Sequence, residues 1–124
     1  MTERRGFRDL IVYQKAYCLS IKVFEITNRF PKDEKYSLVD QVRRSSRSVV
    51  ANIAEAWAKR IYEKSFVSKL SDSYGEELET EVWLDLSKDL KYITIDIHKE
   101  IMLEYDEVRK MLISMINNPG KFCK

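Results

Sequence analysis

The stretch VRRSSRSVVANIAEAWAKR, residues 42–60, determines how this chain folds. The run Ser37–Asp40 (SLVD) before it resembles a capping box with Asp in place of Glu. Apolar residues then recur at multiples close to 3.6, which is the period of one helix face. These positions are Leu38, Val42, Val49, Ile53 and Ala56. The pattern predicts an amphipathic helix over residues 37–60.

Three further helices are predicted around this one. The first covers residues 12–30 and stops before Pro31, because the residue preceding a proline disfavours helix. The third covers residues 63–90, and Thr94 is a suitable N-cap for a fourth helix over 95–117. No segment is typical of a strand pair, and the short connections make neighbouring helices antiparallel. We therefore expect an all-α, antiparallel up-down-up-down four-helix bundle, with residues 1–124 forming a single domain.

Composition limits the classes of protein that this chain can belong to. With 124 residues it can bury one core unaided, and its 22 basic and 20 acidic residues leave a net charge of only +2. No apolar run approaches the roughly 18–20 residues that span a bilayer, and the N-terminus shows no secretory signal. Cys18 and Cys123 lie at opposite ends of the chain. Two unrelated thiols are typical of a reduced, cytoplasmic protein.

The predicted third helix carries apolar residues on an unusually wide part of its circumference. From Phe66 to Leu90 they recur every four residues, so the row turns by about 40° at each step. A helix that is apolar all round is buried on more than one side. This favours a homo-oligomer, although a tilted helix wrapped by its own neighbours gives the same pattern. The expected subunit contact consists of Val82, Trp83, Leu84 and Leu86.

Two acidic residues of the same helix, Glu77 and Glu81, are predicted to point into the bundle. A di-iron or di-manganese site would need Glu-x-x-His pairs, but the single histidine, His98, follows Ile95 at that spacing. We therefore expect no metal and no cofactor. Buried carboxylates need hydrogen-bond partners, which Ser45, Ser46 or nearby arginines can supply. The predicted buried polar network comprises Ser45, Ser46, Asn52, Glu77 and Glu81.

No set of residues supports a class of reaction. No nucleophile has a plausible base, and the chain lacks a glycine-rich phosphate loop and a Cys/His metal spacing. His98 lies toward the apolar face of its helix, where a structural role is expected. Glu55 is expected to form a salt bridge at a bundle or subunit contact. We predict that the protein is not an enzyme.

The basic residues of segment 38–60 allow two interpretations. Arg43, Arg44 and Arg47 fall on the side of their helix away from its apolar row, Lys59 and Arg60 follow, and Arg4, Arg5 and Arg8 add charge near the N-terminus. Exposed basic residues could hold the phosphates of RNA or DNA without reading sequence. Alternatively, they could pair with the acidic segment 72–89, within reach of Glu76, Glu79, Glu81 or Asp85, in a structural or protein-interaction module. If the protein binds RNA or DNA, the residues predicted to contact the phosphates are Arg43, Arg44, Arg47, Lys59 and Arg60.

Five segments together resemble one bacterial family, the four-helix bundle proteins encoded by intervening sequences of large-subunit ribosomal RNA genes. They are residues 42–60, FRDLIVYQKAY (Phe7–Tyr17), RFPK (Arg29–Lys32), GEELETEV (Gly75–Val82) and SKDLKYIT (Ser87–Thr94). The resemblance extends over about residues 7–116 and implies the bundle fold. The family's molecular function is unknown. Its association with ribosomal RNA genes favours the nucleic-acid interpretation through genomic context.

The family's bundle also resembles, more distantly, the accessory variability proteins of diversity-generating retroelements. Those proteins form a pentameric barrel and bind nucleic acid and a reverse transcriptase. The resemblance implies a closed ring of this chain and favours five subunits, with RNA, DNA or a protein as partner and no membrane. Where the family usually has glycine after the NIAE step, this chain has Ala56 and Trp57. Trp57 could alter a surface that relatives use for partners.

Overall fold

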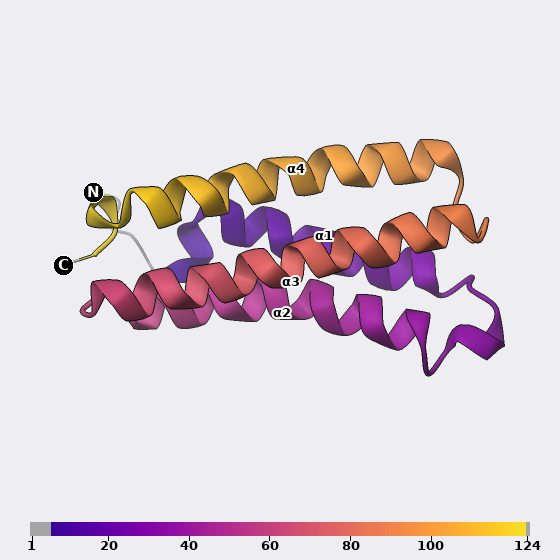
Figure 1. Ribbon diagram of the computed structural model, residues 1–124, viewed down its shortest axis with the longest axis horizontal. Coiled ribbons are helices and arrows are strands. Elements are labelled where there is room, and N and C mark those ends of the chain that lie inside the picture. Colours follow the sequence, from indigo (N-terminus) through magenta and orange to yellow (C-terminus); the bar gives the residue numbers. More distant parts are fainter. Residues whose placement is uncertain (1–5, 124) are drawn as a thin grey trace.

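The computed structural model describes residues 6–123, and these residues contain helices but no strand. Four long helices, labelled in Figure 1, form the molecule: α1 (Ile11–Thr27), α2 (Leu38–Ala58), α3 (Glu63–Asp89) and α4 (Ile95–Asn117). Three short 3-10 helices accompany them: η1 (Phe7–Asp9), η2 (Lys32–Glu34) and η3 (Pro119–Lys121). Consecutive long helices run in opposite directions along the bundle (Figure 1). The predicted all-α four-helix bundle is confirmed.

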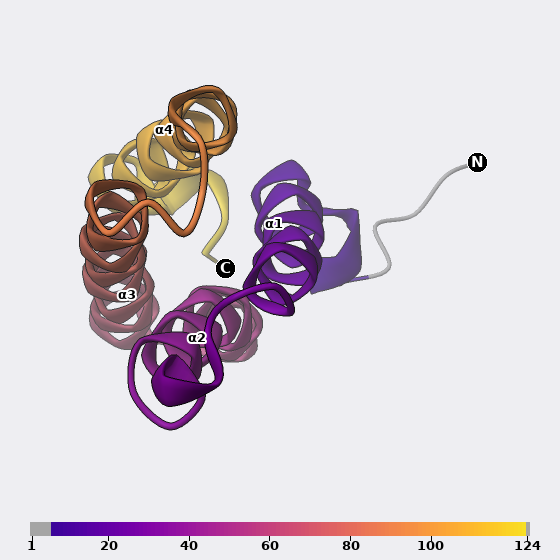
Figure 2. The same cartoon turned by 90° about the vertical axis from the view of Figure 1, so that its right-hand side faces the viewer.

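The four helices stand in chain order around the bundle axis, so that α1 lies diagonally opposite α3 (Figure 2). Side-chain pairs between α1 and α4 show their antiparallel direction. Lys15 pairs with Glu107, whereas Lys22, farther along α1, pairs with the earlier Glu100. Each helix therefore packs against its two sequence neighbours, with α4 closing the square against α1. None of the described helices combines the length and the apolar character that a membrane span requires.

The helix ends follow the predictions closely, with two differences. Thr94 accepts a hydrogen bond from the Ile97 amide at 3.1 Å, as expected for an N-cap. Ser37, however, makes no capping bond, because its hydroxyl donates to Glu34 Oε1 at 2.7 Å. α1 ends at Thr27 rather than near residue 30, and the following residues form tight turns that lead into Pro31. The amides of residues 28–30 bond to carbonyls three residues back, so the last turn is tighter than an α-helix.

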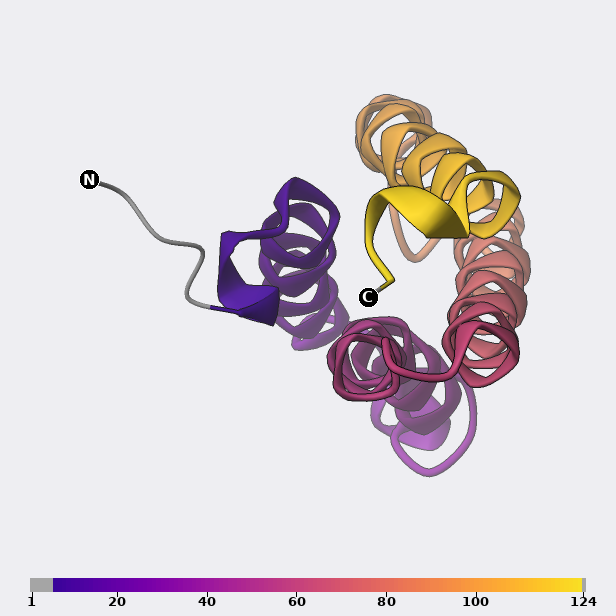
Figure 3. The ribbon, with the colours of Figure 1, turned by 90° about the vertical axis from the view of Figure 1, so that its left-hand side faces the viewer.

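The core is a continuous apolar cluster to which all four helices contribute. Val23, Ile53, Phe66 and Leu112 are among its fully buried members, and burying each such side chain stabilises the fold by about 1.5–3 kcal/mol. A smaller cluster closes the end that carries the α1–α2 and α3–α4 connections. Its buried members are Phe30, Leu38, Val39 and Ile93. At the opposite end, the C-terminal segment after α4 folds back over the bundle (Figure 3).

Candidate functional site

Arg44 extends from α2 to α3, where it is neutralised. Its guanidinium lies 3.4 Å from Glu76 and also pairs with Glu79. The hydrogen bonds to these two carboxylates raise the pKa of Arg44 above its ordinary value. This is the geometry that the structural interpretation of the basic residues requires.

Arg43 turns the other way, toward the C-terminal end of α1. Its Nε donates to Thr27 Oγ1 at 2.8 Å, and its Nη2 donates to Asn28 Oδ1 at 3.1 Å and to the Phe24 carbonyl at 3.3 Å. The guanidinium also lies 4.4 Å from the centroid of the Phe24 ring. All these partners are neutral, and burial, followed by the charge of Arg47, lowers the pKa of Arg43. Its positive charge is therefore held in place but not compensated by these partners.

The other basic residues of the predicted site are scattered. Arg47 is exposed, and its side chain forms no hydrogen bond or ion pair with another described residue. Lys59 is exposed just beyond the end of α2, about 18 Å farther along the helix axis. Arg60 folds onto Trp57, with its guanidinium 3.7 Å from the ring centroid and Nε donating to the Trp57 carbonyl. Arg43, Arg44 and Arg47 thus lie away from the buried row of α2, but the side chains of Arg43 and Arg44 diverge toward α1 and α3.

Residues near the N-terminus complete the list of predicted basic groups. Arg8 is exposed in η1 and lies over the ring of Phe7, 4.5 Å from its centroid. Arg4 and Arg5 lie outside the described residues. Among the described arginines of α2, Arg43 and Arg47 lie close to each other and have no acidic partner, whereas Arg44 is paired.

The predicted buried polar network is divided between separate groups. Ser45 accepts a hydrogen bond from Thr80 at 2.8 Å, and Ser46 donates to the carbonyl of Arg43 at 3.1 Å. Asn52 donates to the carbonyl of Ser48 within its own helix. Neither serine reaches Glu77, so the prediction that they satisfy this acid is wrong. The serine hydroxyls bond to nearer helix carbonyls and to a threonine.

Glu77 is a fully buried acid in the middle of α3. No hydrogen-bond donor reaches either of its oxygens. Burial, reinforced by the neighbouring Glu81, raises the pKa of Glu77 to about 9, and the charge of Arg109 only partly opposes this. Near neutral pH Glu77 is therefore protonated. Glu81 in turn accepts from Arg109 at 2.7 Å, so a nearby arginine satisfies one of the two acids, as expected.

Tyr105 and His98 are the other polar residues to consider for a metal site in the bundle. The Tyr105 hydroxyl is buried without a hydrogen-bond partner, and burial together with the charge of Glu77 raises its pKa. His98 pairs with Asp85 at 2.8 Å. Within residues 6–123, no group of three or more His, Cys, Asp or Glu side chains is arranged to hold a metal ion.

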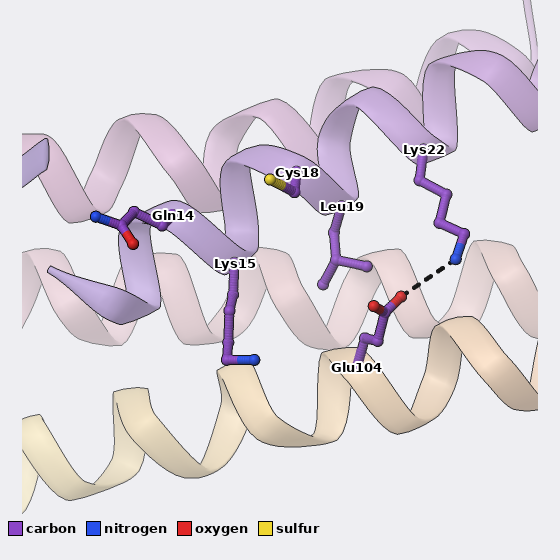
Figure 4. A pocket seen from close by; sticks show the side chains of 6 residues that line it. All are labelled: Gln14, Lys15, Cys18, Leu19, Lys22 and Glu104. Atoms are coloured by element: carbon purple, nitrogen blue, oxygen red, sulfur yellow. Dashed lines mark hydrogen bonds and ion pairs between the residues drawn. The ribbon is translucent and has the colours of Figure 1, made fainter.

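A cavity of about 240 Å³ lies between α1 and α4 (Figure 4). Two lysines reach across it, and both are paired: Lys15 with Glu107 at 3.1 Å, and Lys22 with Glu104 at 3.4 Å. Leu19 points into the space between them (Figure 4). Because its lysine charges are already balanced, this cavity is a weak candidate for an anion site.

The four residues of the predicted subunit contact point in different directions. Leu84 is fully buried in the core, and Trp83 is half-buried with its Nε1 donating to Glu79 at 3.2 Å. Only Val82, 52% exposed, and Leu86, 41% exposed, face outward. Residues two apart on a helix lie about 200° from each other, so Val82 and Leu84 occupy opposite sides. Placing Leu84 at a subunit contact was therefore wrong.

An outward-facing apolar surface nevertheless exists on α3 and α4. Ile95 and Leu103 of α4 are 73% and 63% exposed. They and Met102 line a groove of about 520 Å³ whose α3 wall includes Glu81. We call the exposed residues of both helices the α3/α4 surface: Leu78, Val82, Leu86, Ile95 and Leu103. The apolar spacing of α4 predicts only its inward face, so these outward residues of α4 were not predicted.

Ion pairs occupy two other sides of the bundle. The α1–α4 side carries the lysine–glutamate pairs described above, and Arg44 spans the α2–α3 side. Glu55 forms a salt bridge with Lys69 on that same side at 3.0 Å, the bundle contact expected for it. Trp57 is half-buried and packs against the core. Large exposed apolar residues occur on α1 as well, among them Ile11 and Tyr17.

These features define a class of protein: an all-helical bundle with paired or solvated charges and, within residues 6–123, no assembled metal site. The sequence matches the family described as 23S rRNA-intervening sequence protein over residues 8–114. The chain belongs to that family, which confirms the resemblance seen in the sequence.

A solved structure supports the same conclusion. A crystal structure of a protein with unknown function from the S23 ribosomal protein family of Bacteroides thetaiotaomicron is 30% identical and has a TM-score of 0.79. The match covers 86% of this chain and 96% of that one. Among curated proteins, none matches this sequence.

Proposed function

We propose that this protein is a non-catalytic assembly module that associates with copies of itself through the α3/α4 surface. The observation that carries the proposal is the exposure of large apolar side chains on these adjacent helices. Monomeric proteins rarely expose a contiguous apolar patch of more than a few hundred Å². A closed ring of five subunits, and a location in the cytoplasm, remain predictions.

The composition of the α3/α4 surface suits a protein partner. Its groove is lined by apolar side chains and by charged groups of both signs, such as Lys88, Lys99 and Asp106. Protein interfaces commonly combine apolar and polar groups. The mixed charges would also limit which partner could bind.

Introducing negative charges on the α3/α4 surface is expected to dissociate the oligomer without unfolding the protomer. In the double variant Val82→Asp, Leu103→Asp both new carboxylates stay hydrated in a monomer but would be buried in an assembly. Light scattering coupled to size exclusion should show the unmodified protein as an oligomer and the variant as a folded monomer. Ile21→Asp, a similarly exposed position on α1, is the matched control and should leave the oligomer intact. A monomeric unmodified protein at micromolar concentration would refute the proposal.

A second function, binding of RNA or DNA phosphates, is supported by the uncompensated charges of Arg43 and Arg47. Arg47 is exposed and unpaired by the other described residues, and Arg43 contacts neutral groups alone. Exposed basic groups of this kind attract phosphates in a way that depends strongly on salt. Arg44 is excluded from this role because Glu76 and Glu79 already neutralise it.

This division of the arginines predicts different responses to mutation. Arg47→Ala combined with Lys59→Ala should weaken binding of labelled RNA and DNA at low salt. It should also reduce the slope of log affinity against log salt by about 1–2. Arg44→Ala combined with Glu79→Ala removes one charge of each sign from an existing ion pair, so this matched control should change neither quantity. Equal losses in both variants would contradict the assignment.

A further inference from the structure

A strip of partly exposed aromatic rings runs along α1, next to its contact with α2. Tyr13, Tyr17 and Phe24 follow one another at helical spacings of four and seven residues. The Tyr13 and Tyr17 rings lie 5.9 Å apart, and Phe7 of η1 packs edge-on to Tyr13 at 4.9 Å. Tyr17 is 48% and Phe24 43% exposed. We call Tyr13, Tyr17 and Phe24 the aromatic strip.

The aromatic strip lies beside the uncompensated positive charge of α2. Arg43 stacks on Phe24, with 4.4 Å between the guanidinium and the ring centroid, and three neutral oxygens fix its position. Arg47, one helical turn farther along α2, is close enough to affect the ionisation of Arg43. Asp40, one turn before Arg43, is exposed and has no described ion pair. Rings and cations therefore meet along one side of the molecule.

From this juxtaposition we propose that the aromatic strip, with Arg43 and Arg47, binds single-stranded nucleic acid by stacking bases on Tyr17 and Phe24. The inference rests on the nucleic-acid function proposed above and specifies its ligand. Aromatic side chains stack with any base, and nearby arginines hold the phosphates, which gives binding without sequence preference. In a duplex the bases are paired and stacked on each other, so they cannot use these rings.

The dimensions of the strip fit such a ligand. Tyr17 and Phe24 are seven residues apart, which corresponds to about 10 Å along the helix axis. This is about three steps of about 3.4 Å between successive nucleotides, so two bases lie between those on the rings. Ile21, 46% exposed, lies between the two rings along the helix axis and offers an apolar contact to an intervening base. The positive charge nearby favours a polyanion over a neutral ligand.

The test compares the unmodified protein with the double variant Tyr17→Leu, Phe24→Leu, which keeps apolar bulk but removes both exposed rings. Labelled oligouridine, oligothymidine and a duplex of equal length are titrated at low salt. Affinity for both single strands should fall about fivefold or more for each ring removed, whereas duplex binding should not change. Tyr36→Leu removes an 83% exposed ring elsewhere and serves as the matched control.

The outcomes separate this inference from the proposal on which it rests. If the unmodified protein binds none of the three nucleic acids, both are overturned. Unchanged single-strand affinity in the double variant overturns the stacking site alone. A change in oligomeric state caused by the ring substitutions would show that another copy of the chain covers the strip, and would also overturn it. Circular dichroism of the variant establishes that its helices are intact.

Discussion

Replacing Glu77 with glutamine is expected to make the protein more stable at neutral and alkaline pH. Because the pKa of Glu77 rises from 4.5 to about 9 on folding, the folded protein binds a proton that the unfolded chain releases above pH 4.5. Stability therefore falls as pH rises between these values, by about 1.4 kcal/mol per pH unit. By pH 7 the accumulated cost is about 3 kcal/mol, which Glu77→Gln removes.

Chemical denaturation at pH 4.5, 7 and 9, the ends of this range and its centre, measures the effect. The two proteins should differ little at the acidic end, and the advantage of the variant should grow steadily toward the alkaline end. Glu25→Gln removes an exposed carboxylate from α1 and is the control for loss of charge alone. A variant less stable than the unmodified protein at every pH would mean that the Glu77 carboxylate stabilises the fold.

The fold was predictable because local and long-range patterns agree. The apolar positions predicted to face the core, Leu38, Val42, Val49, Ile53 and Ala56, are all buried, as their spacing required. Thr94 caps α4 and Pro31 lies just beyond the end of α1, so short-range chemistry set those boundaries. The prediction of an N-cap for α2 failed, because a nearby side chain competes for the capping hydroxyl. Ser37 has a cap sequence, but its hydroxyl donates to Glu34 instead.

The candidate surfaces were less predictable because they depend on which neighbouring helix a side chain can reach. Arg43 and Arg44 are adjacent in sequence, yet one contacts α1 and the other α3. A basic run shows charge but not its partners, and those partners are far away in the chain. The aromatic strip could have been found from the spacing of Tyr13, Tyr17 and Phe24. Its proximity to Arg43 required the packing of α1 against α2.

Replacing Leu84 with aspartate is expected to prevent folding. Leu84 is fully buried among apolar side chains, and a carboxylate there would be charged without a partner or forced to take up a proton. Either costs several kcal/mol, while a domain of this size has about 5–15 kcal/mol of total stability. Thermal melts followed by circular dichroism should show no cooperative transition.

Val82→Asp is the matched control, because it places the same side chain two positions earlier at a half-exposed site. It should retain the melting transition while weakening self-association. The pair distinguishes burial within one bundle from burial between bundles, which the apolar pattern of α3 could not separate. If Leu84→Asp instead folds with an unchanged melting temperature and fails to assemble, Leu84 faces a partner subunit. That result would restore the arrangement predicted from the sequence, and it would move the subunit contact from Val82 to the opposite side of α3.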